Sequence, residues 1–276
     1  MKPISGVQRI AALFESAQAE SRAVLMPYLT LGYPTPEMSM ALVKAALAAG
    51  ADMVELGMPF SDPLADGPTI QEASFAALRQ GMTVSRCLKM AHGLRRRGIE
   101  APMLLMGYYN PILAYGESAF CRKCQQVGVD GLIVPDLPPE EGAPLEGACR
   151  QHGLALIYFL APTSVPRRIR LVAERSEGFI YLVSVTGVTG ERDGLPPDLA
   201  SFVQRVRKAT HKPLAVGFGI GRPKEAAQVA QLADGVIVGS AFVRAAGEAE
   251  AEQKVAALAS ALSEVMVRGC SQDASI

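Results

Sequence analysis

Three carboxylates close together in the sequence are the side chains best placed to do chemistry in this chain. Glu55 lies inside the apolar run DMVELG (52–57), where its surroundings should raise the pKa of the carboxyl toward neutral pH. Asp62 and Asp66 follow in MPFSDPLADGP (58–68), whose prolines restrict the backbone. A carboxyl with a raised pKa suits proton exchange, whereas each aspartate has a plainer interpretation as a turn or helix-cap residue.

Other reactive side-chain types are missing from the apolar runs. His92, His152 and His211 lie in segments that lead into a run, and no lysine or arginine occurs inside one. A histidine metal site and a Schiff-base lysine are therefore disfavoured, and no metal ion is expected. Two roles remain for Glu55. One is acid/base function, and the other is a buried ion pair, although the apolar runs contain no cation that could form it. Asp136, at the end of the fourth run, is a weaker candidate.

Glycine-rich segments follow the last three apolar runs. They are TGVTGERDG (186–194), GFGIG (217–221) and GS (239–240). Glycine lets backbone N–H groups approach an anion closely, and a helix N-terminus adds its positive end. One such segment would equally serve a plain turn. Three of them at consecutive run ends predict a phosphate that is held by the backbone, without a lysine or arginine on the runs.

The elements that must position these groups are eight short apolar runs that alternate with amphipathic stretches. The runs cover 23–29, 52–57, 102–109, 131–137, 155–162, 179–185, 213–219 and 235–240. The amphipathic stretches cover 37–49, 84–97, 116–127, 140–152, 165–176, 197–209 and 222–232, with a first helix over about 4–18 and a last over about 246–267. Nearly continuous apolar runs are typical of parallel strands that are buried on both faces.

Eight strand–helix units predict an α/β fold, a (β/α)8 TIM barrel with an extra N-terminal helix. We expect residues 1–276 to form this single domain, with the last few residues disordered. The alternative is a doubly wound open sheet, which would normally carry its glycine-rich loop after the first strand. The glycine-rich segments here follow late strands instead, and in barrels such loops bind phosphate while the chemistry sits at the carboxyl ends of the strands.

Composition narrows the function classes further. The chain has 276 residues, 49% of them hydrophobic, and a formal net charge of zero, which favours neither nucleic acid nor a membrane surface as a partner. No apolar run reaches membrane-spanning length, and the first twenty residues do not match a signal peptide. Five scattered cysteines fit a reducing cytoplasm. Cys121 and Cys124 form a lone C-x-x-C that we interpret as structural.

The stretch VELGMPFSDPLADGP (54–68) closely resembles the signature of tryptophan synthase alpha chains. Supporting motifs run from the first strand to the eighth, so the resemblance covers nearly the whole chain; they are PYLTLGYP (27–34), LMGYYNP (105–111), VPDLP (134–138), GVTG (187–190), GFGI (217–220) and GS (239–240). Tyr28 stands where phenylalanine is common in the family. The tail from Arg268 to Ile276 carries no family pattern.

The resemblance implies a lyase of tryptophan biosynthesis that cleaves indole-3-glycerol phosphate to indole and D-glyceraldehyde 3-phosphate without a cofactor of its own. It implies that Glu55 is the acid/base group and that Asp66 contacts the indole N–H, so the two carboxylates take different roles. The family's phosphate ligands correspond to Gly190, Gly219, Gly239 and Ser240. Its indole pocket corresponds to Tyr28, Tyr181, Phe218 and Ile70.

The resemblance also implies a partner, a beta subunit that carries pyridoxal phosphate and receives indole through a tunnel in a cytoplasmic alpha2beta2 tetramer. Lid and partner-facing positions correspond to Pro59, Asp62 and Thr189, and loop 59–66 is expected to meet the partner. Three rivals stay open. Indole-glycerol phosphate synthase would need a catalytic lysine, a regulatory subunit would bind a phosphorylated ligand without turnover, and a stand-alone lyase would release free indole.

Overall fold

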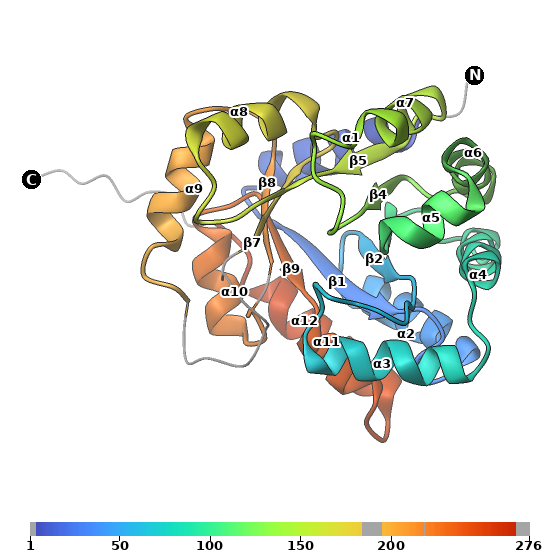
Figure 1. Cartoon of the computed structure of the whole chain (residues 1–276). Coiled ribbons are helices and arrows are strands. Elements are labelled where there is room, and N and C mark those ends of the chain that lie inside the picture. The colour runs from blue at the N-terminus through green and yellow to red at the C-terminus, as the bar shows by residue number, and fades with distance from the viewer. Residues whose placement is uncertain (1–3, 184–194, 218, 269–276) are drawn as a thin grey trace, which may run out of the picture.

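The computed structural model describes residues 4–183, 195–217 and 219–268. Its strands pair in parallel around a barrel, and helices cover the outside (Figure 1). The sheet order is β5-β4-β3-β2-β1-β9-β8-β7-β6. The strands are β1 (Val24–Thr30), β2 (Val54–Gly57), β3 (Met103–Met106), β4 (Gly131–Ile133), β5 (Ala155–Ile157), β6 (Phe159–Leu160), β7 (Ile180–Val183), β8 (Leu214–Gly217) and β9 (Gly235–Val238).

The fifth predicted strand is divided into β5 and β6. The described residues therefore contain nine strands where the sequence predicted eight. β5 pairs with β4 on one side, and β6 pairs with β7 on the other. Tyr158 stands between them, donates its backbone N–H to Ser176 Oγ at 3.1 Å and accepts the N–H of Tyr181 at 3.0 Å. The sheet therefore closes through this one stretch of chain, and the predicted barrel is confirmed.

The outer helices mostly match the predicted amphipathic stretches. They are α2 (Pro36–Ala48), α3 (Pro68–Arg79), α4 (Val84–Arg96), α5 (Tyr109–Tyr115), α6 (Glu117–Val127), α7 (Ala143–Gln151), α8 (Pro166–Arg175), α9 (Leu199–Arg207), α10 (Pro223–Ala230), α11 (Ser240–Ala246) and α12 (Ala251–Glu264). The threonine caps Thr35 and Thr83 accept backbone N–H groups in the first turns of α2 and α4. The predicted last helix, over about 246–267, is confirmed as α12, whereas α3, α5 and α11 were not among the predicted stretches.

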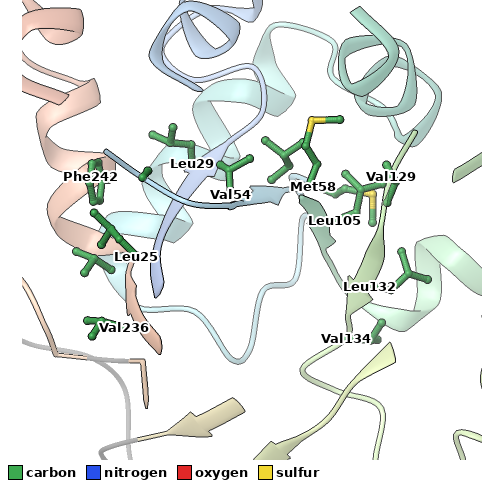
Figure 2. Packing of buried hydrophobic residues seen from close by; sticks show 14 of the residues in the cluster. Leu25, Leu29, Val54, Met58, Leu105, Val129, Leu132, Val134, Val236 and Phe242 are labelled. Atoms are coloured by element: carbon green, nitrogen blue, oxygen red, sulfur yellow. The ribbon is translucent and has the colours of Figure 1, made fainter. Parts of the chain in front are cut away.

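The core has two layers because each strand is buried on both faces. Leu25, Leu29 and Val54 point outward from the sheet and pack against helices, with Phe242 of α11 beside them (Figure 2). Residues at alternate positions, such as Met26 on β1, fill the barrel interior in a second cluster. This arrangement explains the nearly continuous apolar runs in the sequence.

The predicted first helix is confirmed as α1 (Gly6–Ala19). It begins with a capping box, in which Ser5 and Gln8 bond to each other's backbone N–H groups. Its buried residues Ile10 and Phe14 belong to the interior cluster, and the ring of Phe14 lies 5.7 Å from that of Phe179. α1 thus covers the amino-terminal end of the barrel and leaves the opposite end for a site.

Two further points concern the extent of the chain. None of the described helices is both long and apolar enough to cross a lipid bilayer. The disorder expected for the last few residues falls on 269–276, which lie outside the described residues.

Candidate active site

A cavity of about 350 Å³ lies at the carboxyl-terminal ends of the barrel strands. It brings together residues that the sequence singled out on separate elements: Tyr28, Glu55, Asp66, Ile70, Tyr181, Gly219, Gly239 and Ser240. Gly190, Thr189 and Phe218 were also predicted for the site, but they fall outside the described residues. The strand ends therefore assemble most of the predicted site in one hollow, as the barrel fold requires.

Glu55 projects from β2 into the barrel, in register with Tyr28 on β1 and Leu104 on β3. Its side chain is fully buried, and neither carboxyl oxygen has a hydrogen-bond partner among the described residues. Burial raises the pKa of Glu55 to about 8, so the carboxyl is protonated at neutral pH. No ion pair of Glu55 is found in the described part of the chain. The alternative of a structural ion pair therefore loses its support.

Asp66 reaches the same cavity from the loop after β2. Its backbone does form the turn that its sequence context allows, since the Asp66 N–H donates to the Pro63 carbonyl at 3.0 Å. Its side chain is only 6% exposed, however, and lines the cavity. Burial raises the pKa of Asp66 to about 6, against the lowering effect of a hydrogen bond from Tyr108. At pH 7 Asp66 is thus largely ionised, whereas Glu55 keeps its proton.

Two tyrosines form the walls beside these carboxyls. A Cβ atom placed on Gly57 would lie 2.1 Å from the Tyr28 hydroxyl, and one on Gly217 would lie 2.4 Å from the Tyr181 hydroxyl. Glycine at the ends of β2 and β8 therefore gives both rings their space. The ring of Tyr181 packs on Phe159 at 4.6 Å. With Ile70 of α3, the two tyrosines make a surface that suits a flat aromatic ligand.

The glycine-rich end of the cavity contains two side chains that the sequence interpretation missed. Arg222 precedes α10 and Arg244 lies in α11, and both line the cavity. Arg244 Nη2 would lie 4.0 Å from a Cβ atom on Gly221. The sequence predicted a phosphate held without a lysine or arginine on the strands, and these arginines do not lie on strands. Arg222 directly follows GFGIG, and Arg244 follows GS by a few residues.

Glu225 fixes the backbone at this end. Its carboxylate accepts the N–H of Gly221 at 2.9 Å and the N–H of Arg222 at 3.1 Å. The start of α10 is thus capped by the chain's own carboxylate. Gly219, with φ of +79°, adopts a conformation that favours glycine. Gly239 and Ser240, at the start of α11, also line the cavity.

The lid and partner-facing candidates lie on the outer part of the same loop. Asp62 is exposed and accepts a hydrogen bond from Ser61 Oγ at 2.5 Å, and it does not line the cavity. Pro59 is half-buried. Leu64 between Asp62 and Asp66 is 91% exposed, an unusual setting for a leucine. The role of this stretch in binding a partner stays a prediction.

The remaining candidates have structural surroundings. Asp136 accepts the backbone N–H of Tyr109 at 2.9 Å, near the start of α5. Cys121 and Cys124 are buried in α6, and Cys121 Sγ lies 3.7 Å from Cys149 Sγ. The His152 ring contacts Gln125. Across residues 4–183, 195–217 and 219–268, no group of three or more histidine, cysteine or acidic side chains is arranged to hold a metal ion.

Comparison with known proteins gives one consistent result. Residues 14–269 match the family model described as tryptophan synthase alpha chain. The tryptophan synthase alpha chain of Dehalococcoides mccartyi is 51% identical over 86% of this chain and 92% of its own length. That of Chloroflexus aurantiacus is 46% identical over 94% and 98%.

Solved structures agree with these relatives. A structure of Mycobacterium tuberculosis tryptophan synthase superposes with a TM-score of 0.88 and 39% identity, covering 97% of this chain and 100% of the matched one. A protein from Aquifex aeolicus gives the same TM-score and identity, with 95% and 99% covered. Both the barrel and the order of its elements are therefore shared with these proteins.

Proposed function

The chain belongs to the tryptophan synthase alpha chain family, and we propose that Glu55 and Asp66 carry out the family's reaction in the cavity at the strand ends. The activity is that of a lyase in tryptophan biosynthesis, which cleaves indole-3-glycerol phosphate to indole and D-glyceraldehyde 3-phosphate. One observation carries the assignment of residues: two carboxyls of different pKa, about 8 and about 6, face one cavity. Carboxyls with separated pKa values are suited to separate acid and base roles.

Glu55 is the proton donor in this proposal. An indole carbanion is a poor leaving group, so the reaction begins when the Glu55 carboxyl gives its proton to C3 of the ring. The bond from C3 to the glycerol carbon then breaks, and its electron pair restores the aromatic ring. The hydroxyl on that glycerol carbon loses its proton and becomes the aldehyde. The Glu55 carboxylate left by the first step takes this proton, which returns the enzyme to its starting form.

Asp66 is the electrostatic partner. Protonation of C3 places positive charge on the ring nitrogen, and the ionised Asp66 carboxylate stabilises this charge through the indole N–H. Tyr28, Tyr181 and Ile70 hold the ring between them. The low exposure of Asp66 supports this role, because a charge–charge interaction is stronger in a site that excludes water.

The substrate phosphate binds at the glycine-rich end, at Gly219, Gly239 and Ser240, with Gly190 as the fourth family position. Backbone N–H groups approach the phosphate where glycine leaves room. Arg222 and Arg244 add positive charge to this end of the cavity. Phe218 and Thr189, carried over from the family, complete the proposed pocket and lid.

The proposed partner is the beta subunit, with which this family works. We assign the alpha2beta2 arrangement, the pyridoxal phosphate on the beta subunit and a cytoplasmic location to the protein as part of the proposal. Loop 59–66, with Pro59, Asp62 and the exposed Leu64, is the surface offered to that subunit. The alpha reaction as written needs no cofactor of its own, because Glu55 makes both proton transfers and Asp66 stabilises the charge that develops on the ring.

An assay of indole release from indole-3-glycerol phosphate, with and without a beta subunit, tests the proposal. We expect turnover in both conditions and a higher rate with the beta subunit. No turnover in either condition would overturn the lyase assignment and favour a regulatory role. Equal rates in both conditions would instead favour a lyase that works alone.

A further inference from the structure

Tyr108 follows β3 and touches the loop after β2 at three places. Its ring stacks on Phe60, with centroids 5.2 Å apart and planes inclined by 29°. Its hydroxyl oxygen accepts the backbone N–H of Ala65 at 2.9 Å. Its hydroxyl also lies close to the side chain of Asp66 and lowers the pKa of that carboxyl. These contacts fix both ends of loop 59–66 to one side chain, which is itself only 5% exposed.

Because the Tyr108 oxygen accepts from Ala65, its single hydrogen is free to be donated to the Asp66 carboxylate. Burial and the nearby charge of Asp66 raise the pKa of the Tyr108 hydroxyl. It therefore stays a donor across the range in which enzymes of this kind are assayed. A hydrogen bond to the charged form of a carboxyl favours that form.

We propose that Tyr108 is a positioning residue that holds the end of loop 59–66, and with it the Asp66 carboxylate, in the cavity. This inference rests on the proposed function, since it assumes that ionised Asp66 takes part in the reaction. The ring and the hydroxyl have separate jobs. The ring holds the start of loop 59–66 through Phe60, and the hydroxyl holds its end through the backbone N–H of Ala65.

The surroundings of Asp66 make this hydroxyl important. The other titratable groups that face Asp66 from neighbouring strands are Tyr28 on β1, Glu55 on β2 and Tyr181 on β7. Glu55 is protonated at neutral pH, and the pKa values of both tyrosines are raised by burial. Arg222, Arg244 and Glu225 line the glycine-rich end of the same cavity. The neighbouring Tyr108 hydroxyl favours the charged form of Asp66 and so lowers the pKa of its carboxyl.

Tyr108→Phe separates the two jobs, because phenylalanine keeps the stacking on Phe60 and removes only the hydroxyl. We expect the acidic limb of the kcat/KM–pH profile to move from about 6 to higher pH by about 0.5–1 pH unit. We expect kcat/KM at the pH optimum to fall by about 3–10-fold. Tyr109→Phe is the matched control: this neighbouring hydroxyl donates to Glu117 at 2.8 Å, and its loss should leave the limb in place.

A Tyr108→Phe profile that coincides with that of Tyr109→Phe would overturn the inference. A merely structural role would lower the thermal midpoint or the amount of active enzyme, and it would not move the limb. Asp66→Asn is measured in parallel to keep two failures apart. If Asp66→Asn keeps near-normal turnover, the proposed function of Asp66 is wrong. If Asp66→Asn is inactive while the limb of Tyr108→Phe is unmoved, only the role of Tyr108 is wrong.

Discussion

The two ends of the barrel use carboxylates in opposite ways. At the amino-terminal end Asp52, Asp130 and Asp234 stand just before β2, β4 and β9, and each accepts the backbone N–H at or near the start of a neighbouring strand. Each also pairs with arginine; the partners are Arg22 for Asp52, Arg9 and Arg95 for Asp130, and Arg207 and Arg268 for Asp234. At the carboxyl-terminal end Glu55 has neither kind of partner among the described residues.

This difference separates carboxylates that hold the fold from carboxylates available for a reaction. A buried carboxylate that is fully paired stabilises the fold through its partners. Removing one partner leaves a buried charge unpaired, which destabilises the folded state. A buried carboxyl with no partner avoids that cost by keeping its proton, which it can then transfer. The three aspartates join strands at one end, and the unpartnered glutamate faces the cavity at the other. The predictions below test this division.

The largest effect should come from Glu55→Gln. The amide keeps the size of the side chain and removes the transferable proton, so indole release should fall by about 10²–10⁴-fold. Substrate binding should be largely kept. The measurement is steady-state turnover together with substrate affinity. Near-normal activity of the variant would contradict the acid/base role.

The same variant should be more stable than the wild type at alkaline pH. The pKa of Glu55 is higher in the folded chain, about 8, than its ordinary value of 4.5, so ionisation opposes folding. This cost is absent below pH 4.5 and grows by about 1.4 kcal/mol per pH unit up to the folded pKa. Urea unfolding at pH 5 and pH 9 checks it. The advantage of the glutamine should be found at pH 9 and be nearly absent at pH 5.

Asp130→Asn should give the reverse pattern. It leaves Arg9 and Arg95 without their shared carboxylate and weakens the bond to the Met103 N–H. We expect the free energy of unfolding to fall by about 3–5 kcal/mol, as for other broken buried pairs. Turnover per folded molecule should stay near that of the wild type. A loss of turnover without a loss of stability would break the proposed division between the two ends.

The pH profile of kcat/KM should be a bell with limbs near the two pKa values. Asp66 must be ionised, so activity is lost as pH falls through about 6. Glu55 must be protonated, so activity is lost as pH rises through about 8. In Glu55→Asp any residual activity should show a changed alkaline limb and an unchanged acidic limb. A flat profile between pH 5 and 9 would show that these two groups do not govern the rate.

The smallest effect concerns the phosphate end. A methyl group on Gly239 would make ordinary contacts, 3.7 Å to Ile70 and 3.8 Å to Tyr28, so Gly239→Ala should fold normally. The methyl nevertheless enters the cavity beside the proposed phosphate position. We expect KM to rise about tenfold, which corresponds to about 1.4 kcal/mol, with little change in kcat. Gly147→Ala, where the added atom meets nothing within 4 Å, is the control.

Much of the fold could be predicted because strands that are buried on both faces leave an unmistakable run of apolar residues. The runs located each strand of the described residues, and Glu55 stood out as a carboxyl in the middle of one of them. α3 was harder to predict because it begins directly after a proline-rich segment, at Pro68. The division at Tyr158 depends on pairing with two different neighbours, which no local pattern encodes.

The site was less predictable where it depends on contacts between distant segments. Asp66 resembles a turn residue in sequence, and its burial comes from packing of its loop against Tyr108, more than forty residues away. Arg222 and Arg244 were not predicted as site residues because they lie at the start of α10 and within α11, and not on the strands. A search of the first turns after each strand, as well as the strands themselves, would have found both.

Helix α1 lies across the amino-terminal end of the barrel, and its position bears on how ligands enter and leave the cavity. Its residues Ile10 and Phe14 are packed into the interior cluster, so in the described chain the amino-terminal end of the barrel is closed and the cavity lies at the opposite end. Under the proposed function, substrate and both products would enter and leave at that end, where the loop that carries Asp66 lines the cavity. A partner seated at this end would control arrival and departure at once, and indole could be handed on without first reaching bulk water.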